Sequence, residues 1–177
     1  MGAVNLLLVN TRGEVLLQRR PLDKENGGRW DKSVGGHVAA GEDFETTARR
    51  EGGEELFDDA TSARVVVVPS AAFSETCAQQ DLTQVVVVAL RARHLNLRDV
   101  RVGPDGSLRN VRYHVAVFAG RTDVPLAGFS PQRSEIDALA YWAPAAVDRM
   151  LLRGELAPNM AFLWLAHAHA ALSLAAR

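Results

Sequence analysis

Two valine-rich runs, at residues 65–68 and 85–90, indicate what kind of core this chain can build. β-branched side chains pack well on a pleated surface, so such runs are typical of strands that are buried in a sheet. The segments 4–9 and 14–18 flank a short turn at Thr11–Gly13, which predicts a hairpin. Further extended segments are expected at 30–38, 111–118 and 135–142.

A helix is predicted over residues 43–57, because apolar or small side chains recur there at every fourth position, at Phe44, Ala48, Gly52 and Leu56. Two more helices are expected at 144–152 and 157–176. The polar segment 93–110 contains glycine and proline at its centre, which indicates a protruding loop or hairpin. This order of elements, with strands, a helix, more strands and final helices, predicts a mixed α/β (α+β) fold around one sheet.

Length and composition exclude several classes of protein. A chain of 177 residues suits a single domain, which we expect to span 1–177. Its formal net charge of −1 argues against a broad nucleic-acid-binding face, since such binding rests on phosphate neutralisation. The single cysteine, Cys77, allows neither an intramolecular disulfide nor a cysteine-based zinc site. The apolar stretches at 3–9 and 160–176 are too short or too polar for a targeting or membrane segment, so we expect a cytoplasmic protein.

Three carboxylates carry the chemical information. Glu51, Glu54 and Glu55 lie three and four residues apart, so a helix presents them on one face. Such a trio repels itself unless a cation neutralises it, and ligands that are all oxygen favour Mg²⁺ or Mn²⁺. Gly36 lets the backbone approach closely, so its carbonyl is a further candidate ligand. Because Mg²⁺ takes remaining ligands from phosphates, the pattern suits diphosphate chemistry.

The residues around the trio support an organised site over an ordinary solvated acidic face. Glu42 precedes Arg50 by eight residues, and we expect an ion pair that clamps the entering loop to the helix. Gly52 and Gly53 stand within the helix, where each costs about 1 kcal/mol relative to alanine. Marginal pairing of surface charges does not explain that cost.

The segment 36–58 resembles the Nudix box, in which Gly is followed by spaced Glu, Arg-Glu and Glu-Glu positions. The matching residues are Gly36, Glu42, Arg50, Glu51, Glu54 and Glu55. Gly52, Phe57 and Asp58 depart from the pattern, at positions that serve packing and capping. We expect Gly52 to let the helix pack closer to the sheet, and Asp58 or Asp59 to end the helix.

The segments that flank the box are similar to the isopentenyl-diphosphate-isomerase-like branch of Nudix hydrolases. They are 16–20, 30–38 and the residues around Glu135 and Pro158. The resemblance implies an α/β/α sandwich around a mixed sheet. It also implies a metal-dependent pyrophosphohydrolase that cleaves the diphosphate bridge of a nucleoside diphosphate linked to another group. Homodimers are common in such a family. The isomerase itself is disfavoured, because its catalytic cysteine falls where this chain has Gly35.

The resemblance also assigns roles. Glu51 and Glu55 are the expected principal metal ligands, with Glu54 as a further ligand or the general base. Arg50 and Glu42 are expected to support catalysis, and Gly36 to supply a backbone ligand. Outside the box, Glu75 and Glu135 are alternative bases, and Arg19 or Arg20 is expected to contact the diphosphate of a small-molecule substrate.

A second function stays open at this point. The departures at Gly52, Phe57 and Asp58 are compatible with a non-catalytic Nudix-fold sensor or ligand-binding module. Substrate specificity is expected to reside in loops outside the box, at 74–82 and 93–110.

Overall fold

The computed structural model describes residues 1–59, 61–102 and 107–173. Their strands form one mixed sheet, in which the main path runs β3-β2-β1-β7-β6-β5, with β4 paired to β1 and β8 paired to β2. The pairs β1–β7 and β5–β6 are parallel and the other pairs are antiparallel. The strands are β1 (Gly2–Val9), β2 (Val15–Arg19), β3 (Trp30–Asp31), β4 (Val34–His37), β5 (Val65–Val68), β6 (Val86–Val102), β7 (Leu108–Arg121) and β8 (Ala138–Trp142).

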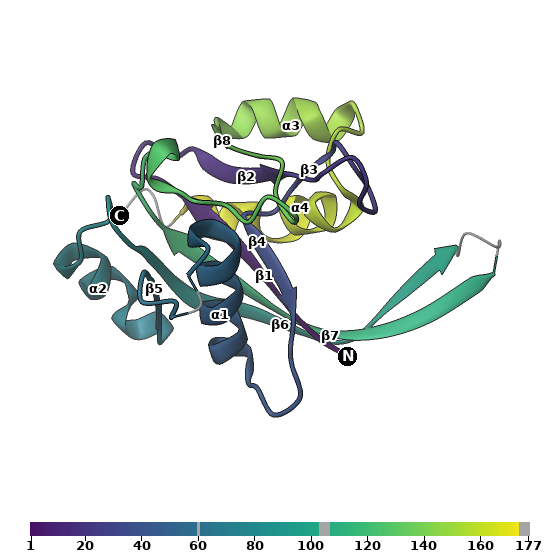
Figure 1. The fold of residues 1–177 in the computed structure, drawn as a ribbon, viewed down its shortest axis with the longest axis horizontal. Coiled ribbons are helices and arrows are strands. Elements are labelled where there is room, and N and C mark those ends of the chain that lie inside the picture. Colours follow the sequence, from purple (N-terminus) through teal and green to yellow (C-terminus); the bar gives the residue numbers. More distant parts are fainter. Residues whose placement is uncertain (60, 103–106, 174–177) are drawn as a thin grey trace.

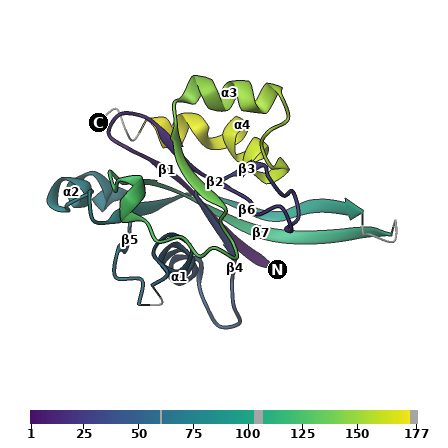
Figure 2. The same ribbon diagram turned by 45° about the horizontal axis from the view of Figure 1, so that its top comes forward.

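Helices cover both faces of the sheet. The helix α1 (Phe44–Phe57) packs on one face, where even-numbered side chains of β1 and the start of β6 are buried. The helices α3 (Pro144–Leu152) and α4 (Pro158–Leu172) cover the opposite face (Figure 2). Alternating side chains of a strand point to opposite faces, so each strand contributes side chains to both cores. The expected α/β/α sandwich around a mixed sheet is confirmed.

The short helix α2 (Phe73–Gln79) follows β5 after a 3₁₀ turn (Ser70–Ala72), and a second 3₁₀ turn (Leu126–Gly128) precedes β8. Phe73 and Cys77 are one helical turn apart, and both pack on Val87 and Ala89 of β6. Val86 and Val88, which alternate with those two residues, pack on the α1 side. Thus α2 lies on the face of the sheet that is opposite to α1.

Three predicted segments need correction. The segment 74–82 is not a loop but is largely helical, because Phe73 and Cys77 bury one face of α2. The last strand begins at Ala138 and not at 135, since Glu135 and Ile136 donate backbone hydrogen bonds to Gln132 in a turn. The last helix ends at Leu172, with Ser173 as its C-cap, and residues 174–176 of its predicted range lie outside the described residues.

The segment 93–110 forms part of a long hairpin. β6 and β7 pair well beyond the layer that the helices cover, and this two-stranded arm projects from the body of the protein (Figure 1). The sequence left a loop or a hairpin open, and the hairpin is confirmed. Its predicted centre, 103–106, lies outside the described residues.

The ends of α1 are capped by aspartates. The side chain of Asp43 accepts a hydrogen bond of 2.7 Å from the Thr46 backbone N–H. Asp58 adopts a left-handed conformation, with φ of 49°, and its N–H donates to the Glu54 carbonyl. Aspartate tolerates this conformation better than most residues, so the predicted helix stop at Asp58 is confirmed.

Candidate active site

Gly36 of β4 lies directly under the Glu51 side chain of α1. A Cβ atom at Gly36 would overlap the Glu51 carboxyl group, so glycine is required for this contact. Burial raises the pKa of Glu51, although the neighbouring Arg50 opposes that effect. The strand and the helix thus bring a carboxylate and a backbone together, and Gly36 allows the close approach that the sequence predicts.

The helix itself sits close to the sheet at Gly52. A Cβ atom there would lie 3.2 Å from a methyl carbon of Val65, which is tighter than ordinary van der Waals contact. The absence of a side chain at Gly52 therefore allows the close packing that the sequence predicts.

Arg50 connects the carboxylates of the site. Its Nε and Nη2 donate to the two carboxylate oxygens of Glu42, each at 3.0 Å. Its Nη1 lies 2.9 Å from Glu51 and 3.1 Å from Glu54, and its Nη2 also donates to the His37 carbonyl at 3.2 Å. Hydrogen bonds from Arg50 and Thr47 lower the pKa of Glu42 to about 2. The predicted Glu42–Arg50 ion pair is confirmed.

Glu55 points away from Arg50, into the sheet. Its carboxylate accepts from Gln18 Nε2 at 3.3 Å and from the Gly35 backbone N–H at 3.4 Å. Burial raises the pKa of Glu55 to about 8, although the charge of Lys32 opposes the rise. A carboxyl group in such a setting gains most from a nearby cation, because a cation favours its charged form.

Beside Glu55 lies a buried charge cluster that the sequence interpretation missed. The Lys32 ammonium is 3.2 Å from the Asp31 carboxylate, which also binds Arg20 at 3.0 Å. Lys32 packs over Gly35, where a Cβ atom would overlap its side chain. The only signal in the sequence is a set of polar residues, including Gln18, within segments that read as buried strands.

The donor set fits a hard divalent cation, although the carboxylates are not gathered around one point. Within residues 1–59, 61–102 and 107–173, no three His, Cys, Asp or Glu side chains form a cluster that could hold a metal ion. Glu51 and Glu54 pair with Arg50 instead, while Glu55 faces Gln18. All these donors are oxygens, and the space above Gly36 accommodates a carboxylate, so the residues suit Mg²⁺ or Mn²⁺ better than zinc.

The other expected site residues lie at different distances from this centre. β2 ends at Arg19, which pairs with Asp137 at 3.2 Å, while Arg20 faces Asp31. Glu135 pairs with Lys24 at 2.9 Å and follows a segment whose Gln132 N–H donates to the Glu55 carbonyl. Glu75 lies on α2, on the opposite face of the sheet, where it accepts from Gln79. The fold therefore brings Glu135 toward α1 and separates Glu75 from it.

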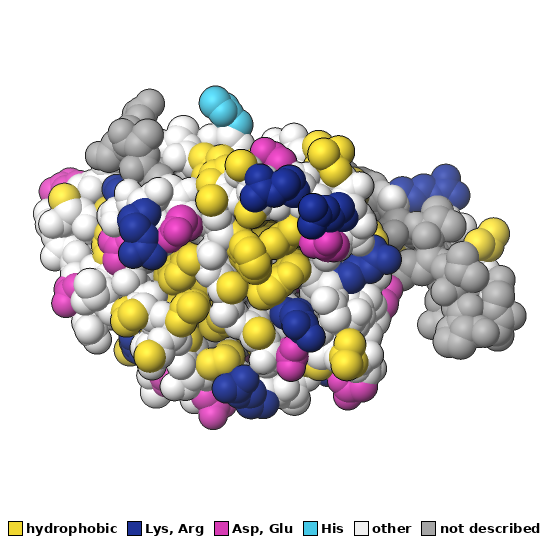
Figure 3. Space-filling model, turned by 90° about the horizontal axis from the view of Figure 1, so that it is seen from above, with side chains coloured by type: hydrophobic (Ala, Val, Ile, Leu, Met, Phe, Trp, Pro, Cys, Tyr) yellow, Lys and Arg dark blue, Asp and Glu magenta, His cyan; other side chains and the backbone are white. Residues whose placement is uncertain are grey.

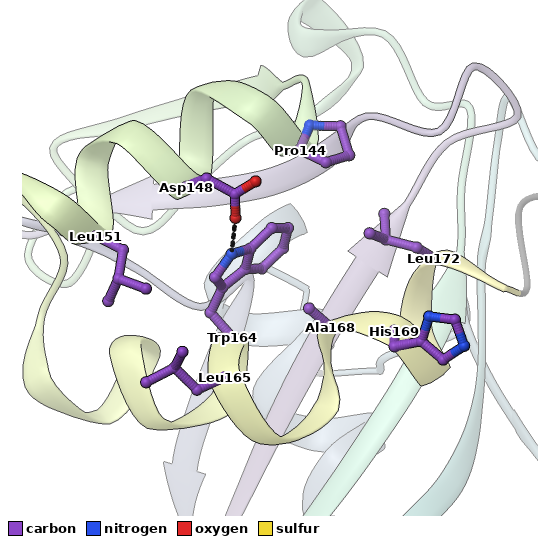
Figure 4. Close-up of a pocket in the computed structure, with 8 residues that line it drawn as sticks. All are labelled: Pro144, Asp148, Leu151, Trp164, Leu165, Ala168, His169 and Leu172. Carbon is purple, nitrogen blue, oxygen red and sulfur yellow. Dashed lines mark hydrogen bonds between the residues drawn. The ribbon is translucent and has the colours of Figure 1, made fainter.

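A groove of about 350 Å³ lies elsewhere, between α3 and α4. Its lining is mostly apolar, and the Asp148 carboxylate accepts from the indole N–H of Trp164 at 2.7 Å (Figure 4). Hydrophobic side chains gather on the face of the molecule that Figure 3 shows. The groove lining includes neither lysine nor arginine, so this groove does not suit a diphosphate.

A comparison with family models matches the NUDIX domain to residues 1–114. The chain belongs to the Nudix family. Among curated proteins, an uncharacterised Nudix hydrolase of Pseudomonas aeruginosa is 48% identical over 52 residues, which are 29% of this chain and 31% of that protein. The match thus spans about a third of the curated relative.

Solved structures show the same fold at low sequence identity. A Nudix hydrolase of M. smegmatis, RenU, has a TM-score of 0.58 at 20% identity, with 98% of this Nudix chain and 86% of that chain covered. The NUDIX domain of Shewanella oneidensis NrtR, solved in complex with ADP ribose, has a TM-score of 0.55 at 15% identity, with coverages of 96% and 86%. These likenesses support the Nudix fold of the whole described chain.

Proposed function

We propose that this Nudix protein is a divalent-metal-dependent pyrophosphohydrolase. The observation that carries the proposal is the Glu51 carboxylate seated on Gly36, with Glu54 and Glu55 on the same turn of α1. In this proposal, the carboxylates of Glu51, Glu54 and Glu55 and the Gly36 carbonyl hold Mg²⁺ or Mn²⁺. When bound, such an ion neutralises charge on phosphoryl oxygens and lowers the pKa of a bound water.

The residues of the chain position this site. Arg50 binds Glu42, Glu51 and Glu54 at once, so it couples the loop before α1 to the metal-binding turn. Glu54 is partly exposed, and Glu135 is brought toward the end of α1, so these two are the favoured candidates for accepting a proton from the attacking water. Glu75, on the opposite face of the sheet, is the weaker candidate.

We propose a substrate in which a nucleoside diphosphate is linked to another group. The ADP ribose bound to the NrtR domain belongs to this chemical class, which makes it a sensible first probe. Arg19 and Arg20 are the proposed contacts to the diphosphate. The Arg19–Asp137 pair is about half exposed, so exchange of the carboxylate for a phosphate costs little.

The test is turnover of a panel of diphosphate compounds, ADP ribose included, with Mg²⁺ or Mn²⁺ and product identification by mass spectrometry. The variants E51Q, E54Q and E55Q each remove one carboxylate without changing the size of the side chain. E45Q is the matched control, because Glu45 lies on the first turn of α1 and pairs with Arg93. We expect metal-dependent turnover that E51Q and E55Q abolish and E45Q preserves. Full turnover by E51Q and E55Q would refute the ligand assignment.

A non-catalytic binding module is the second candidate, favoured by the departures at Gly52, Phe57 and Asp58. Calorimetry across the same panel separates the two. Binding of a diphosphate compound without any product over many hours, in Mg²⁺ and in Mn²⁺, would favour the module.

We also propose that residues 1–177 form a single domain. Support comes from β8, α3 and α4, which lie beyond the matched residues yet complete the sheet and its second core. Among the described residues, no helix has the length and apolar character that crossing a membrane requires. The cytoplasmic location and a homodimer remain predictions.

A further inference from the structure

Two arginines on the α2 side of the sheet each have a buried guanidinium nitrogen without a hydrogen-bond partner among the described residues. Arg91 of β6 and Arg121 at the end of β7 each bury their Nε atom, and neither Nε has a hydrogen-bond partner. Among the residues that the structure describes, neither guanidinium forms an ion pair. Buried polar groups are hydrogen-bonded in the great majority of cases, so two such atoms, both on arginines that act on Cys77, call for an explanation.

The strand geometry directs both side chains to one face. Arg121 lies opposite Val87, which packs under α2, and so it shares that face of the sheet. Arg91 is the additional residue of a β-bulge, because Leu90 pairs with Phe118 while Ala92 pairs with the adjacent Val117. Bulges change the direction of a side chain, and here the Arg91 guanidinium lies 5.1 Å from the centre of the Phe73 ring.

The thiol of Cys77, one turn after Phe73 on α2, lies within the field of both arginines. Burial raises the pKa of Cys77, whereas Arg121 and Arg91 each act to lower it. No carboxylate among the described residues balances the two guanidinium charges. The region is therefore a concentrated positive charge on the face of the sheet opposite to α1.

We propose that Arg91 and Arg121 form a binding site for a phosphoryl group, separate from the carboxylate site on α1. A guanidinium presents its donors in a planar fork that matches phosphate oxygens, and each buried Nε–H would gain the acceptor that it lacks. A phosphate monoester carries a charge of about −1.5 to −2 at neutral pH, which balances two arginines better than one carboxylate does. Both residues are only partly buried, so a small anion can approach their guanidinium groups, and the buried Nε–H groups bond to it once the side chains turn toward it.

The test uses inorganic phosphate as the probe on the full chain, in a buffer that contains EDTA. In nitrogen-15 NMR spectra, the Nε–H signals of Arg91 and Arg121 are assigned from their loss in R91K and R121K. We expect both signals to shift in a saturable manner with phosphate, and acetate at equal ionic strength to shift them far less. Unmoved signals, or equal shifts with acetate, would overturn the proposal.

Variants supply the second measurement. R91M and R121M are each expected to weaken phosphate binding at least tenfold in calorimetry and to remove the rise in Tm that phosphate causes. R149M is the matched control, since Arg149 is an exposed arginine on α3. Phosphate affinity in R91M and R121M equal to that of the wild type would contradict the site. Should a methionine variant fail to fold, the NMR titration of the wild type still decides the question.

Discussion

Arg50 binds both carboxylate oxygens of Glu42 through two parallel hydrogen bonds of 3.0 Å. Such forked pairs fix direction as well as distance. Because Glu42 stands in the loop before α1 and Arg50 on its second turn, the pair ties the entry of the helix to the turn that carries the carboxylates. The same guanidinium also contacts Glu51 and Glu54, so its geometry sets theirs.

The first prediction concerns this fork. Lysine carries the same charge as arginine but has a single ammonium group, so R50K cannot maintain the paired bonds to Glu42 together with those to Glu51 and Glu54. We expect R50K to lower turnover at least tenfold and the free energy of unfolding by about 1–2 kcal/mol. Kinetics and urea unfolding measure the two effects. R49K, at an exposed neighbouring position, should change neither. Wild-type turnover in R50K would show that the fork is dispensable.

The second prediction concerns the Gly36–Glu51 contact. In G36A the added methyl group overlaps the Glu51 carboxyl group, which must move. We expect turnover to fall at least tenfold while the free energy of unfolding falls by about 1–3 kcal/mol, as for other overpacked positions. H37A, at the exposed next residue, is the control. Retained turnover in G36A would mean that Glu51 acts from a different position.

The third prediction separates the two glycines within α1. Alanine at Gly52 meets Val65 methyl groups at 3.2 and 3.3 Å, while its helix propensity gains about 1 kcal/mol. Alanine at Gly53 meets the Asp59 carbonyl oxygen at 2.6 Å and also overlaps the Ser62 hydroxyl. We therefore expect G52A to stay within about 1 kcal/mol of the wild type and G53A to lose about 1–3 kcal/mol. Thermal unfolding of both variants checks this order of stability. A G52A variant that is less stable than G53A would contradict it.

The fourth prediction is a pH dependence. Burial alone would raise the pKa of Asp31, but the charge and hydrogen bonds of Lys32, together with Arg20, bring it below its ordinary value. A pKa that is lower in the folded state stabilises the fold above the unfolded value of about 3.9, and this stabilisation is lost as the pH falls through the folded value.

The variant D31N tests this sign. At neutral pH it leaves Lys32 buried without its carboxylate, and we expect a loss of about 3–5 kcal/mol. The difference between D31N and the wild type should shrink as the pH falls below about 4, because the unfolded wild-type chain then takes up a proton at Asp31 and the folded protein does so only at lower pH. D137N removes the exposed partner of Arg19 and should cost at most about 1 kcal/mol. A constant difference between D31N and the wild type from pH 7 to pH 3 would contradict the assignment.

Local patterns predicted much of this fold. The valine-rich runs became β5 and the first part of β6, and the four-residue spacing from Phe44 to Leu56 became α1. These predictions succeed because a single periodicity places apolar side chains on one face of a helix or strand, independently of the rest of the chain. α2 was missed because its seven residues are too few for a clear periodicity, and its helical form depends on burial against Val87 and Ala89.

For the candidate site, the sequence alone indicated which carboxylates of α1 are neighbours in the chain, the close approach at Gly36 and the Glu42–Arg50 pair. Helical spacing and a short loop fix these local relationships, but they do not fix where each carboxylate points. Only the tertiary structure decided that Arg50 also binds Glu51 and Glu54, that Glu55 faces Gln18, and that Lys32 lies buried beside it. Likewise, only the β-bulge in β6 and the pairing of Val87 with Arg121 brought Arg91 and Arg121 to the face that α2 covers. Contacts between residues far apart in the chain depend on strand register and burial, which no local pattern encodes.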